Sequence, residues 1–201
     1  KTLNAGFVTT FNDYAVVSEN RLTSIPKKYP LDLAPLYGCA VTTGFGVIEN
    51  NAKLKMGESI IIFGAGGIGL NIVQAASLYN AFPIIAVDQF ENRLELAKEI
   101  GATHCINNKS DANYIKAILD ILGNNGANIV IDNTGNNNII SICYDLTSPQ
   151  GRTILVGVPT KGKETSIYTL PLHFGKVITG SHGGNGNPNE DIPRYMNLEE
   201  N

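Results

Sequence analysis

The pattern of apolar and polar positions changes near residue 59. From there on, short apolar runs alternate with longer amphipathic stretches. Apolar runs with little polar alternation are typical of strands covered on both faces, and amphipathic stretches are typical of helices that pack on a sheet. The pattern predicts strands at 60–63, 84–87, 104–106, 127–131, 153–156 and 177–179, and helices at 67–79, 91–100, 112–122 and 137–146.

This alternation of strand and helix indicates parallel βαβ units. Gly101 and Gly123 directly follow two of the predicted helices, where a glycine often ends a helix. We therefore predict an α/β fold with a doubly wound parallel sheet of the Rossmann type over residues 51–185.

The segment that precedes the predicted sheet has a different pattern. In residues 6–18, Tyr14 and Val16 predict a short strand. A loop with several prolines follows, and it leads into a predicted helix at 39–50. Residues 1–50 are therefore expected to be a remnant of a preceding domain together with a connecting helix.

The segment that follows the predicted sheet is rich in glycine and asparagine. The stretch HGGNGNPNED, residues 182–191, is expected to be an exposed connection. In residues 186–201, Pro193 suits the first turn of a helix that is just starting. Because the chain begins at Lys1 rather than Met and stops within this helix, we expect it to be a piece of a longer protein.

Composition excludes several classes of protein. The chain has 201 residues, of which 43% are hydrophobic and 16% charged, and its formal net charge is −3. This composition allows a hydrophobic core and excludes a disordered polyampholyte, and the charge does not favour binding to nucleic acid. No apolar run approaches the roughly 20 residues that span a bilayer. We expect neither nucleic acid nor a membrane as a partner.

Three cysteines, Cys39, Cys105 and Cys143, are widely separated along the chain. They are too few for a disulfide scaffold, and without a C-x-x-C pair they cannot form a complete structural zinc site. No secretion signal opens the chain. We therefore expect reduced thiols and a cytoplasmic protein.

The sequence GAGGIG, beginning at Gly64, directly follows a predicted strand and opens a predicted helix. In this context each glycine of a G-x-G-x-x-G pattern has a physical task. Gly64 permits a tight turn, Gly66 lets the backbone approach a pyrophosphate, and Gly69 lets the helix pack on the sheet. The N–H groups near Gly67 and Ile68 lie at the positive end of the helix dipole, which favours a phosphate.

Asp88 ends the second predicted strand, about 20 residues after the glycines, where an acid can accept hydrogen bonds from ribose hydroxyls. Its carboxylate would repel a 2′-phosphate, so the two motifs together favour NAD over NADP. Arg93 can reach the ribose or the adenine edge. Two alternatives are a glycine turn that binds no nucleotide and a methyltransferase. The methyltransferase is disfavoured because Phe63, rather than an acidic residue, precedes the glycines.

Four blocks of sequence carry a resemblance to a known family. GCAVTTGFGVIENNAKLKMGESIIIFGAGGIGL, VDQFENRLELAKEIGATHCIN, VIDNTGN and ILVGVP occur in this order. Together they resemble the medium-chain, zinc-dependent alcohol dehydrogenases. The resemblance implies that residues 1–50 contain a remnant of a GroES-like catalytic domain and that residues 186–201 begin the return to that domain.

The resemblance also implies which residues bind the cofactor. These are Gly64, Gly66, Gly67, Ile68 and Gly69 at the pyrophosphate, Asp88 and Arg93 at the adenosine ribose, Asn133, Thr134 and Gly135 after the fourth strand, Val156, Gly157 and Val158 near the carboxamide, and Ser181 and His182 near the pyrophosphate end. Thr43 matches a residue packed near the nicotinamide and is the candidate catalytic residue.

Cys39 matches the third protein ligand of a catalytic zinc in this family. In the whole enzyme such a zinc would act as a Lewis acid on the alcohol oxygen, and hydride would pass to the nicotinamide. The other ligands belong to a part of the family pattern that this sequence lacks, and one cysteine cannot hold the metal. We therefore expect NAD binding, no zinc bound by this chain alone, and no dehydrogenase turnover by it.

The leading hypothesis is the NAD-binding portion of a zinc-dependent alcohol or polyol dehydrogenase that acts on a small alcohol or carbonyl substrate. One alternative is a zinc-free quinone or enoyl reductase of the same superfamily, although Asp88 argues against the NADPH that these usually prefer. Another is a non-catalytic module for nucleotide sensing or oligomerisation. We also expect a homo-oligomer formed through the sheet edge near Val177, because an exposed edge strand invites pairing.

Overall fold

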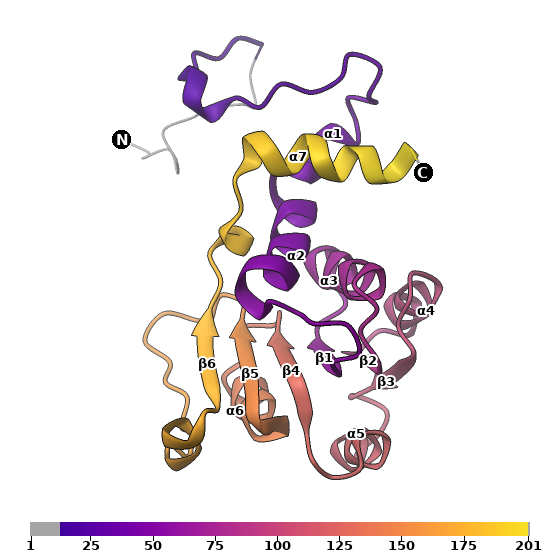
Figure 1. Ribbon diagram of the computed structural model, residues 1–201, viewed down its shortest axis with the longest axis vertical. Coiled ribbons are helices and arrows are strands. Elements are labelled where there is room, and N and C mark those ends of the chain that lie inside the picture. The colour runs from indigo at the N-terminus through magenta and orange to yellow at the C-terminus, as the bar shows by residue number, and fades with distance from the viewer. Residues whose placement is uncertain (1–12, 201) are drawn as a thin grey trace.

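The computed structural model describes residues 13–200, with side chains to residue 198. Its centre is one sheet of parallel strands (Figure 1). The strands are β1 (Ile60–Phe63), β2 (Ile84–Asp88), β3 (His104–Asn107), β4 (Ala127–Asp132), β5 (Thr147–Leu155) and β6 (Val177–Gly180). Their order is β3-β2-β1-β4-β5-β6, so the chain reverses direction across the sheet between β1 and β4. The predicted fold class is confirmed, since this is the order of doubly wound nucleotide-binding sheets.

Helices cover both faces of the sheet. They are α3 (Gly67–Leu78), α4 (Glu91–Glu99), α5 (Tyr114–Leu122) and α6 (Asn137–Leu146). Successive side chains of a strand point to opposite faces. Accordingly, Ile60 and Ile62 of β1 belong to a core with α3 and α4, whereas Ile61 and Phe63 belong to a core with α5 and α6. The uninterrupted apolar strands of the sequence are therefore explained by burial on two sides.

The helix predicted at 39–50 is part of a longer helical stretch. It comprises α1 (Ala34–Leu36), η3 (Tyr37–Val41), α2 (Thr42–Gly46) and η4 (Val47–Ala52). Two of its glycines, Gly44 and Gly46, permit close packing. A Cβ added to Gly44 would lie 2.5 Å from the Cβ of Asn71 in α3, and one added to Gly46 would lie 2.5 Å from the carbonyl oxygen of Gly184.

The last described residues return to this helical stretch. They form η6 (Gly183–Asn185), α7 (Pro188–Met196) and η7 (Asn197–Glu200). The rings of Tyr195 in α7 and Phe45 in α2 lie 4.7 Å apart. Figure 1 shows α7 above the carboxyl ends of the strands, with α2 between α7 and the sheet. Whether residues 1–50 include a GroES-like remnant stays a prediction.

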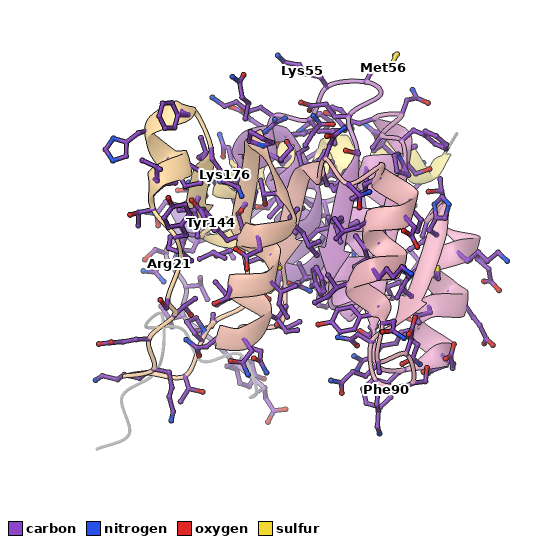
Figure 2. The ribbon with its side chains drawn as sticks, turned by 90° about the horizontal axis from the view of Figure 1, so that it is seen from below. Arg21, Lys55, Met56, Phe90, Tyr144 and Lys176 are labelled. Atoms are coloured by element: carbon purple, nitrogen blue, oxygen red, sulfur yellow. The ribbon has the colours of Figure 1, made fainter. Side chains whose placement is uncertain are left out.

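Strand β6 forms one edge of the sheet and pairs with β5. It follows η5 (Leu170–Phe174) and the buried Lys176, whose Nζ lies 4.3 Å from the centre of the Tyr144 ring in α6 (Figure 2). Burial lowers the pKa of Lys176, and Asp145 partly opposes that shift. This cation–π contact links the start of the edge strand to the helix beside it.

The prediction of a short strand at Tyr14 and Val16 is wrong in the part that the structure describes. These side chains are 92% and 101% exposed, and residues 13–18 form no strand. An isolated strand is not stable without a neighbour to pair with, and none of the described strands lies beside this segment. The rest of that prediction, residues 6–12, lies outside the described residues.

Three further predictions require correction. The helix placed at Pro193 begins earlier, at Pro188, which occupies its first turn, and Pro193 lies inside it. The stretch predicted to be an exposed connection is mostly exposed, but Gly184 within it is buried against α2, and its last residues belong to α7. Strand β5 also begins earlier than predicted, at Thr147, with a register shift before Arg152.

In the described part of the chain, no helix is both long and apolar enough to cross a membrane.

Candidate functional site

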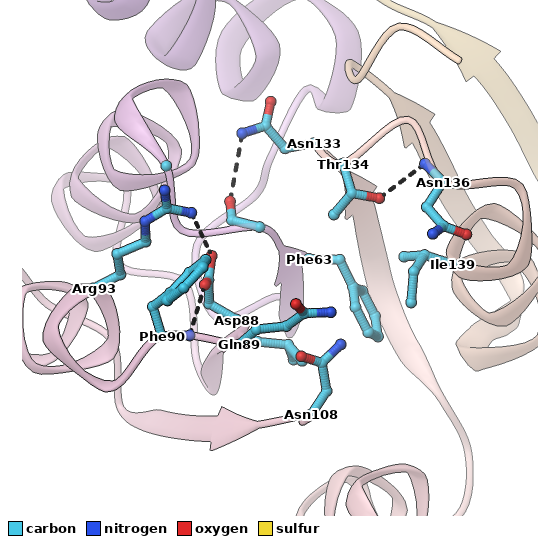
Figure 3. Close-up of a pocket in the computed structure, with 13 residues that line it drawn as sticks. Phe63, Asp88, Gln89, Phe90, Arg93, Asn108, Asn133, Thr134, Asn136 and Ile139 are labelled. Carbon is cyan, nitrogen blue, oxygen red and sulfur yellow. Dashed lines mark hydrogen bonds and ion pairs between the residues drawn. The ribbon is translucent and has the colours of Figure 1, made fainter. Parts of the chain in front are cut away.

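A cavity of about 330 Å³ opens at the carboxyl ends of β1, β2 and β4 (Figure 3). It lies where the strand order reverses, which is the position at which doubly wound sheets bind ligands. Its lining residues are Phe63, Gly64, Gly66, Val87, Asp88, Gln89, Phe90, Arg93, Asn108, Asn133, Thr134, Asn136 and Ile139.

The glycines after β1 have different surroundings. Gly64 has φ of +93°, which favours glycine. A Cβ added to Gly69 would overlap the carbonyl oxygen of Gly64, so this glycine lets α3 approach the turn. By contrast, a Cβ added to Gly66 or Gly67 would meet no atom within 4 Å. The open space therefore lies at Gly66 and Gly67, where α3 begins and where the first helical N–H groups lack partners within the helix.

Asp88 is buried at the end of β2, and its carboxylate is held in place by the backbone. Oδ2 accepts a hydrogen bond from the N–H of Ala65 (2.7 Å), and Oδ1 accepts one from the N–H of Phe90 (3.0 Å). The Arg93 guanidinium lies 3.5 Å from Oδ2 and stacks 4.7 Å from the centre of the exposed Phe90 ring. The carboxylate thus stands beside the glycine turn, where it can accept hydrogen bonds from a vicinal diol.

The loop after β4 forms the facing wall of the cavity. It is folded by Asp132, whose Oδ1 accepts hydrogen bonds from the N–H and the hydroxyl of Thr134 at 3.0 and 2.6 Å. Its Oδ2 accepts one from the N–H of Gly135 at 3.1 Å. Asn133 then reaches back, and its Nδ2 donates to the carbonyl oxygen of Gly64 at 3.4 Å. A fully buried aspartate therefore holds the residues that face the cavity.

The structure brings together some of the residues predicted from the sequence. Gly64, Gly66, Asp88, Arg93, Asn133 and Thr134 all line the cavity. Gly135 and Gly157 pack backbone to backbone behind it, since a Cβ on Gly157 would overlap the N–H of Gly135. Val158 is exposed. Gly67, Ile68, Gly69 and Val156 adjoin these loops without lining the cavity.

Thr43 and His182 lie outside the cavity. Thr43 is buried in α2, and its carbonyl oxygen would lie 2.8 Å from a Cβ added to Gly184. His182 is exposed and caps the start of η6. Beside it, the hydroxyl oxygen of Ser181 accepts a hydrogen bond from the N–H of Gly184 at 3.1 Å. The roles assigned to these residues stay predictions.

Sequence reasoning missed half of the lining. Phe63, Val87, Gln89, Phe90, Asn108, Asn136 and Ile139 were not singled out. Most of them share one signal, because they end a strand or follow one within a few residues. The carboxyl ends of parallel strands meet at one edge of a sheet, so residues there could have been selected by position.

Cys39 is exposed in η3. A catalytic zinc site needs three protein ligands, and within residues 13–200 no three His, Cys, Asp or Glu side chains gather in a way that could hold a metal ion. The described residues therefore do not fit a zinc ion on their own.

The other two cysteines are Cys105 and Cys143, and burial raises the pKa of both thiols. Cys105 also donates a hydrogen bond to the carbonyl oxygen of Leu94 at 3.2 Å.

Comparison with known proteins gives consistent matches. A family model described as zinc-binding dehydrogenase matches residues 67–200. Alcohol dehydrogenase 2 of Oryza sativa subsp. japonica is 34% identical over 193 residues, which is 94% of this chain and 50% of the relative. S-(hydroxymethyl)glutathione dehydrogenase of Paracoccus denitrificans is 32% identical over 194 residues, 94% of this chain and 52% of the relative.

Solved structures agree with the sequence matches. The crystal structure of benzyl alcohol dehydrogenase from Acinetobacter calcoaceticus superposes with a TM-score of 0.86 at 35% identity, and the match covers 92% of this chain and 51% of that one. An alcohol dehydrogenase zinc-binding domain protein from Burkholderia ambifaria also superposes with a TM-score of 0.86 at 35% identity. This chain spans about half the length of the curated relatives it matches.

Proposed function

The chain belongs to the zinc-binding dehydrogenase family, and from that premise we propose that it is the NAD-binding portion of an alcohol dehydrogenase. The whole protein would transfer hydride between NAD and a small alcohol or its carbonyl product. The observation that carries the proposal is the cavity at the reversal of strand order, where the Asp88 carboxylate stands beside the open glycine turn. Shape and chemistry both suit an adenosine diphosphate moiety.

We assign positions to the pyrophosphate and to the adenosine ribose of the dinucleotide. The space over Gly66 and Gly67, at the start of α3, would take the pyrophosphate, whose negative charge the helix dipole favours. Asp88 would accept hydrogen bonds from the ribose hydroxyls. A 2′-phosphate at the same position would meet a buried carboxylate that the backbone holds in place, so NAD is favoured over NADP.

Bound NAD would supply a nicotinamide ring that accepts hydride. The residues of this chain would bind and orient it: Thr43 and Val156 to Val158 are the proposed contacts of its nicotinamide half. Ser181 and His182 are proposed to lie near its pyrophosphate. Cys39 is proposed as one ligand of a zinc ion in the whole protein, with the remaining ligands outside this chain. The chain alone is therefore proposed to bind NAD without turning over an alcohol. A cytoplasmic location and self-association through the edge strand β6 complete the proposal.

The proposal is tested by titrating the chain with NADH and NADPH and following the fluorescence of the nicotinamide. We expect saturable binding of NADH and binding of NADPH that is at least tenfold weaker, because a phosphate close to a carboxylate in a partly buried site is strongly disfavoured. The absence of saturable NADH binding at millimolar concentration, or a preference for NADPH, would contradict the proposal.

A further inference from the structure

One amide on the cavity wall has an unpaired buried atom. The Oδ1 of Asn108 is buried and has no hydrogen-bond partner in the structure, although Asn108 lines the cavity. Most buried polar atoms have a partner, and leaving one unpaired costs roughly 1–3 kcal/mol. An acceptor that lies unsatisfied at a ligand cavity is a reason to ask which donor a ligand would bring.

The position of Asn108 is fixed by the backbone beside Asp88. Its N–H donates to the carbonyl oxygen of Asp88 at 3.2 Å, which continues the pairing of β2 with β3. Asn107 closes the following turn, because its Oδ1 accepts hydrogen bonds from the N–H groups of Lys109 and Ser110 at 3.0 and 3.1 Å. The amide of Asn108 is therefore held one residue beyond the proposed ribose carboxylate.

That position is where a nucleoside places its base. The base is joined to the ribose carbon next to the one that bears the 2′-hydroxyl, so a ribose held by Asp88 keeps its base near the same wall. Phe63, Val87 and Ile139 contribute apolar surface to the cavity, which suits the faces of a heteroaromatic ring. Figure 3 shows the amide ends of Gln89 and Asn108 at one side of the cavity, with Ile139 and Thr134 across from them.

We propose that Asn108 makes the base pocket selective for a 6-aminopurine, with Oδ1 accepting a hydrogen bond from the exocyclic amino group of adenine. The terminal torsion of an asparagine is soft, so the amide can turn toward the cavity when a donor arrives. Its Nδ2 can at the same time donate to N7 of the purine, as Asn does when it contacts adenine in the major groove of DNA. This inference rests on the proposed binding of NAD.

Hypoxanthine is the informative competitor. It has a carbonyl oxygen where adenine has the amino group, so its edge at N7 offers two acceptors and no donor. The amide can then donate one hydrogen bond, but Oδ1 stays without a partner whichever way the amide turns. The two bases have nearly the same size and the same apolar faces. A difference in affinity between their dinucleotides would therefore report on hydrogen bonding at this one edge.

The experiment titrates the chain with NADH and with reduced nicotinamide hypoxanthine dinucleotide, followed by nicotinamide fluorescence. We expect the wild-type chain to bind NADH about fivefold to tenfold more tightly, the size of one neutral hydrogen bond. In Asn108→Leu, which keeps the branched shape of the side chain and removes the acceptor, we expect the preference to fall below about twofold. Asn125→Leu, the same change in an exposed turn at the opposite end of β4, should leave the preference unchanged.

Each outcome has a defined meaning. Equal affinities of the wild-type chain for the two dinucleotides would overturn the inference while leaving NAD binding intact, as would a preference that persists in Asn108→Leu. Since the wild-type comparison needs no variant, the inference stays testable even if Asn108→Leu does not fold. If neither dinucleotide binds the wild-type chain, the proposed function itself fails.

Discussion

At the scale of single residues, the glycines after β1 separate a folding requirement from a binding requirement. Gly69 lies against the backbone of Gly64, whereas Gly66 faces open space. The same substitution should therefore affect binding at Gly66 and folding at Gly69, in line with the different tasks that the sequence pattern implies for them.

Gly66→Ala should leave the unfolding temperature nearly unchanged and abolish NADH binding, because its Cβ would occupy space proposed for the pyrophosphate. Gly69→Ala should destabilise the fold by about 1–3 kcal/mol, the usual cost of overpacking. Thermal unfolding and NADH titration of both variants measure this. An Ala at Gly66 that leaves NADH affinity intact would argue against the pyrophosphate position.

Asp88→Asn tests the ribose carboxylate. The amide retains one acceptor oxygen in place of two, and it loses the charge that repels a 2′-phosphate. NADH affinity should fall by about tenfold, the size of a charge-assisted hydrogen bond, and the preference over NADPH should narrow. Fluorescence titration with both cofactors checks this, with thermal unfolding as the control for folding. An unchanged preference for NADH would exclude Asp88 as its source.

The residues of the site were only partly predictable. The glycines and Asp88 were found because each has a fixed place in a local pattern. Asn108 and Gln89 were not, because their role depends on which strands lie side by side, and β3 and β2 are joined through α4 rather than by a local turn. Asp132 was also missed, because it does not line the cavity: its buried carboxylate accepts hydrogen bonds from the N–H groups of Thr134 and Gly135 and so holds the loop after β4.

At the scale of elements, one carboxylate joins α7 to η4 and to the end of α3, in addition to the apolar packing of α7 on α2. Glu49 of η4 accepts hydrogen bonds from Arg194 at 2.8 and 2.5 Å, from the hydroxyl of Tyr79 at 2.6 Å and from that of Tyr195 at 3.1 Å. Partial burial raises the pKa of Glu49, but these hydrogen bonds and the charge of Arg194 outweigh it, so the pKa lies below its usual value of 4.5.

This cluster predicts how the stability of the chain depends on pH. A carboxylate whose pKa is lowered in the folded state contributes stability above its unfolded pKa, and that contribution is lost as the pH falls through the folded value. Glu49→Gln should therefore unfold at a lower temperature than wild type at pH 7, and the difference should shrink below about pH 4.5.

Thermal unfolding of both proteins between pH 7 and pH 3 measures this effect. The pKa of Glu58 is also lowered: burial raises it, but hydrogen bonds from Arg152 and from the backbone outweigh that effect. Because Glu58 titrates in both proteins, its contribution cancels when they are compared. Glu190→Gln, at an exposed position of α7, is the matched control. A difference between Glu49→Gln and wild type that does not change with pH would show that the charge of Glu49 is not what fixes α7.

The elements themselves were largely predictable, because burial on two faces leaves long apolar runs. The helices at 67–79 and 137–146 agree with the structure to within a residue. The errors fall where a local pattern was overridden. Tyr14 and Val16 are residue types that favour strands, but no described strand lies beside them to pair with. Pro193 lies within α7 because packing on α2 stabilises the helix around it.

At the scale of the whole molecule, β6 leaves one edge of the sheet open in the described structure. Val177 is 46% exposed there, and Leu170 and Phe174 of the preceding η5 are also exposed. We expect the chain to self-associate through this edge, because unpaired strand edges and exposed apolar side chains favour pairing.

Val177→Lys should shift the chain to monomer, because a lysine on an edge strand opposes pairing. Sedimentation at several protein concentrations measures this. Leu96→Lys, the same kind of change at a 43% exposed position of α4, should leave the association of wild type unchanged. A monomeric wild-type chain at every concentration would contradict the expectation.

The most direct test of the central claim is a crystal structure of the chain grown with saturating NADH. We expect density for the dinucleotide in the cavity, with the adenosine ribose within hydrogen-bond distance of Asp88 and the pyrophosphate over Gly66 and Gly67. Density for the dinucleotide at another place, or an empty cavity at a concentration that saturates the fluorescence signal, would contradict it.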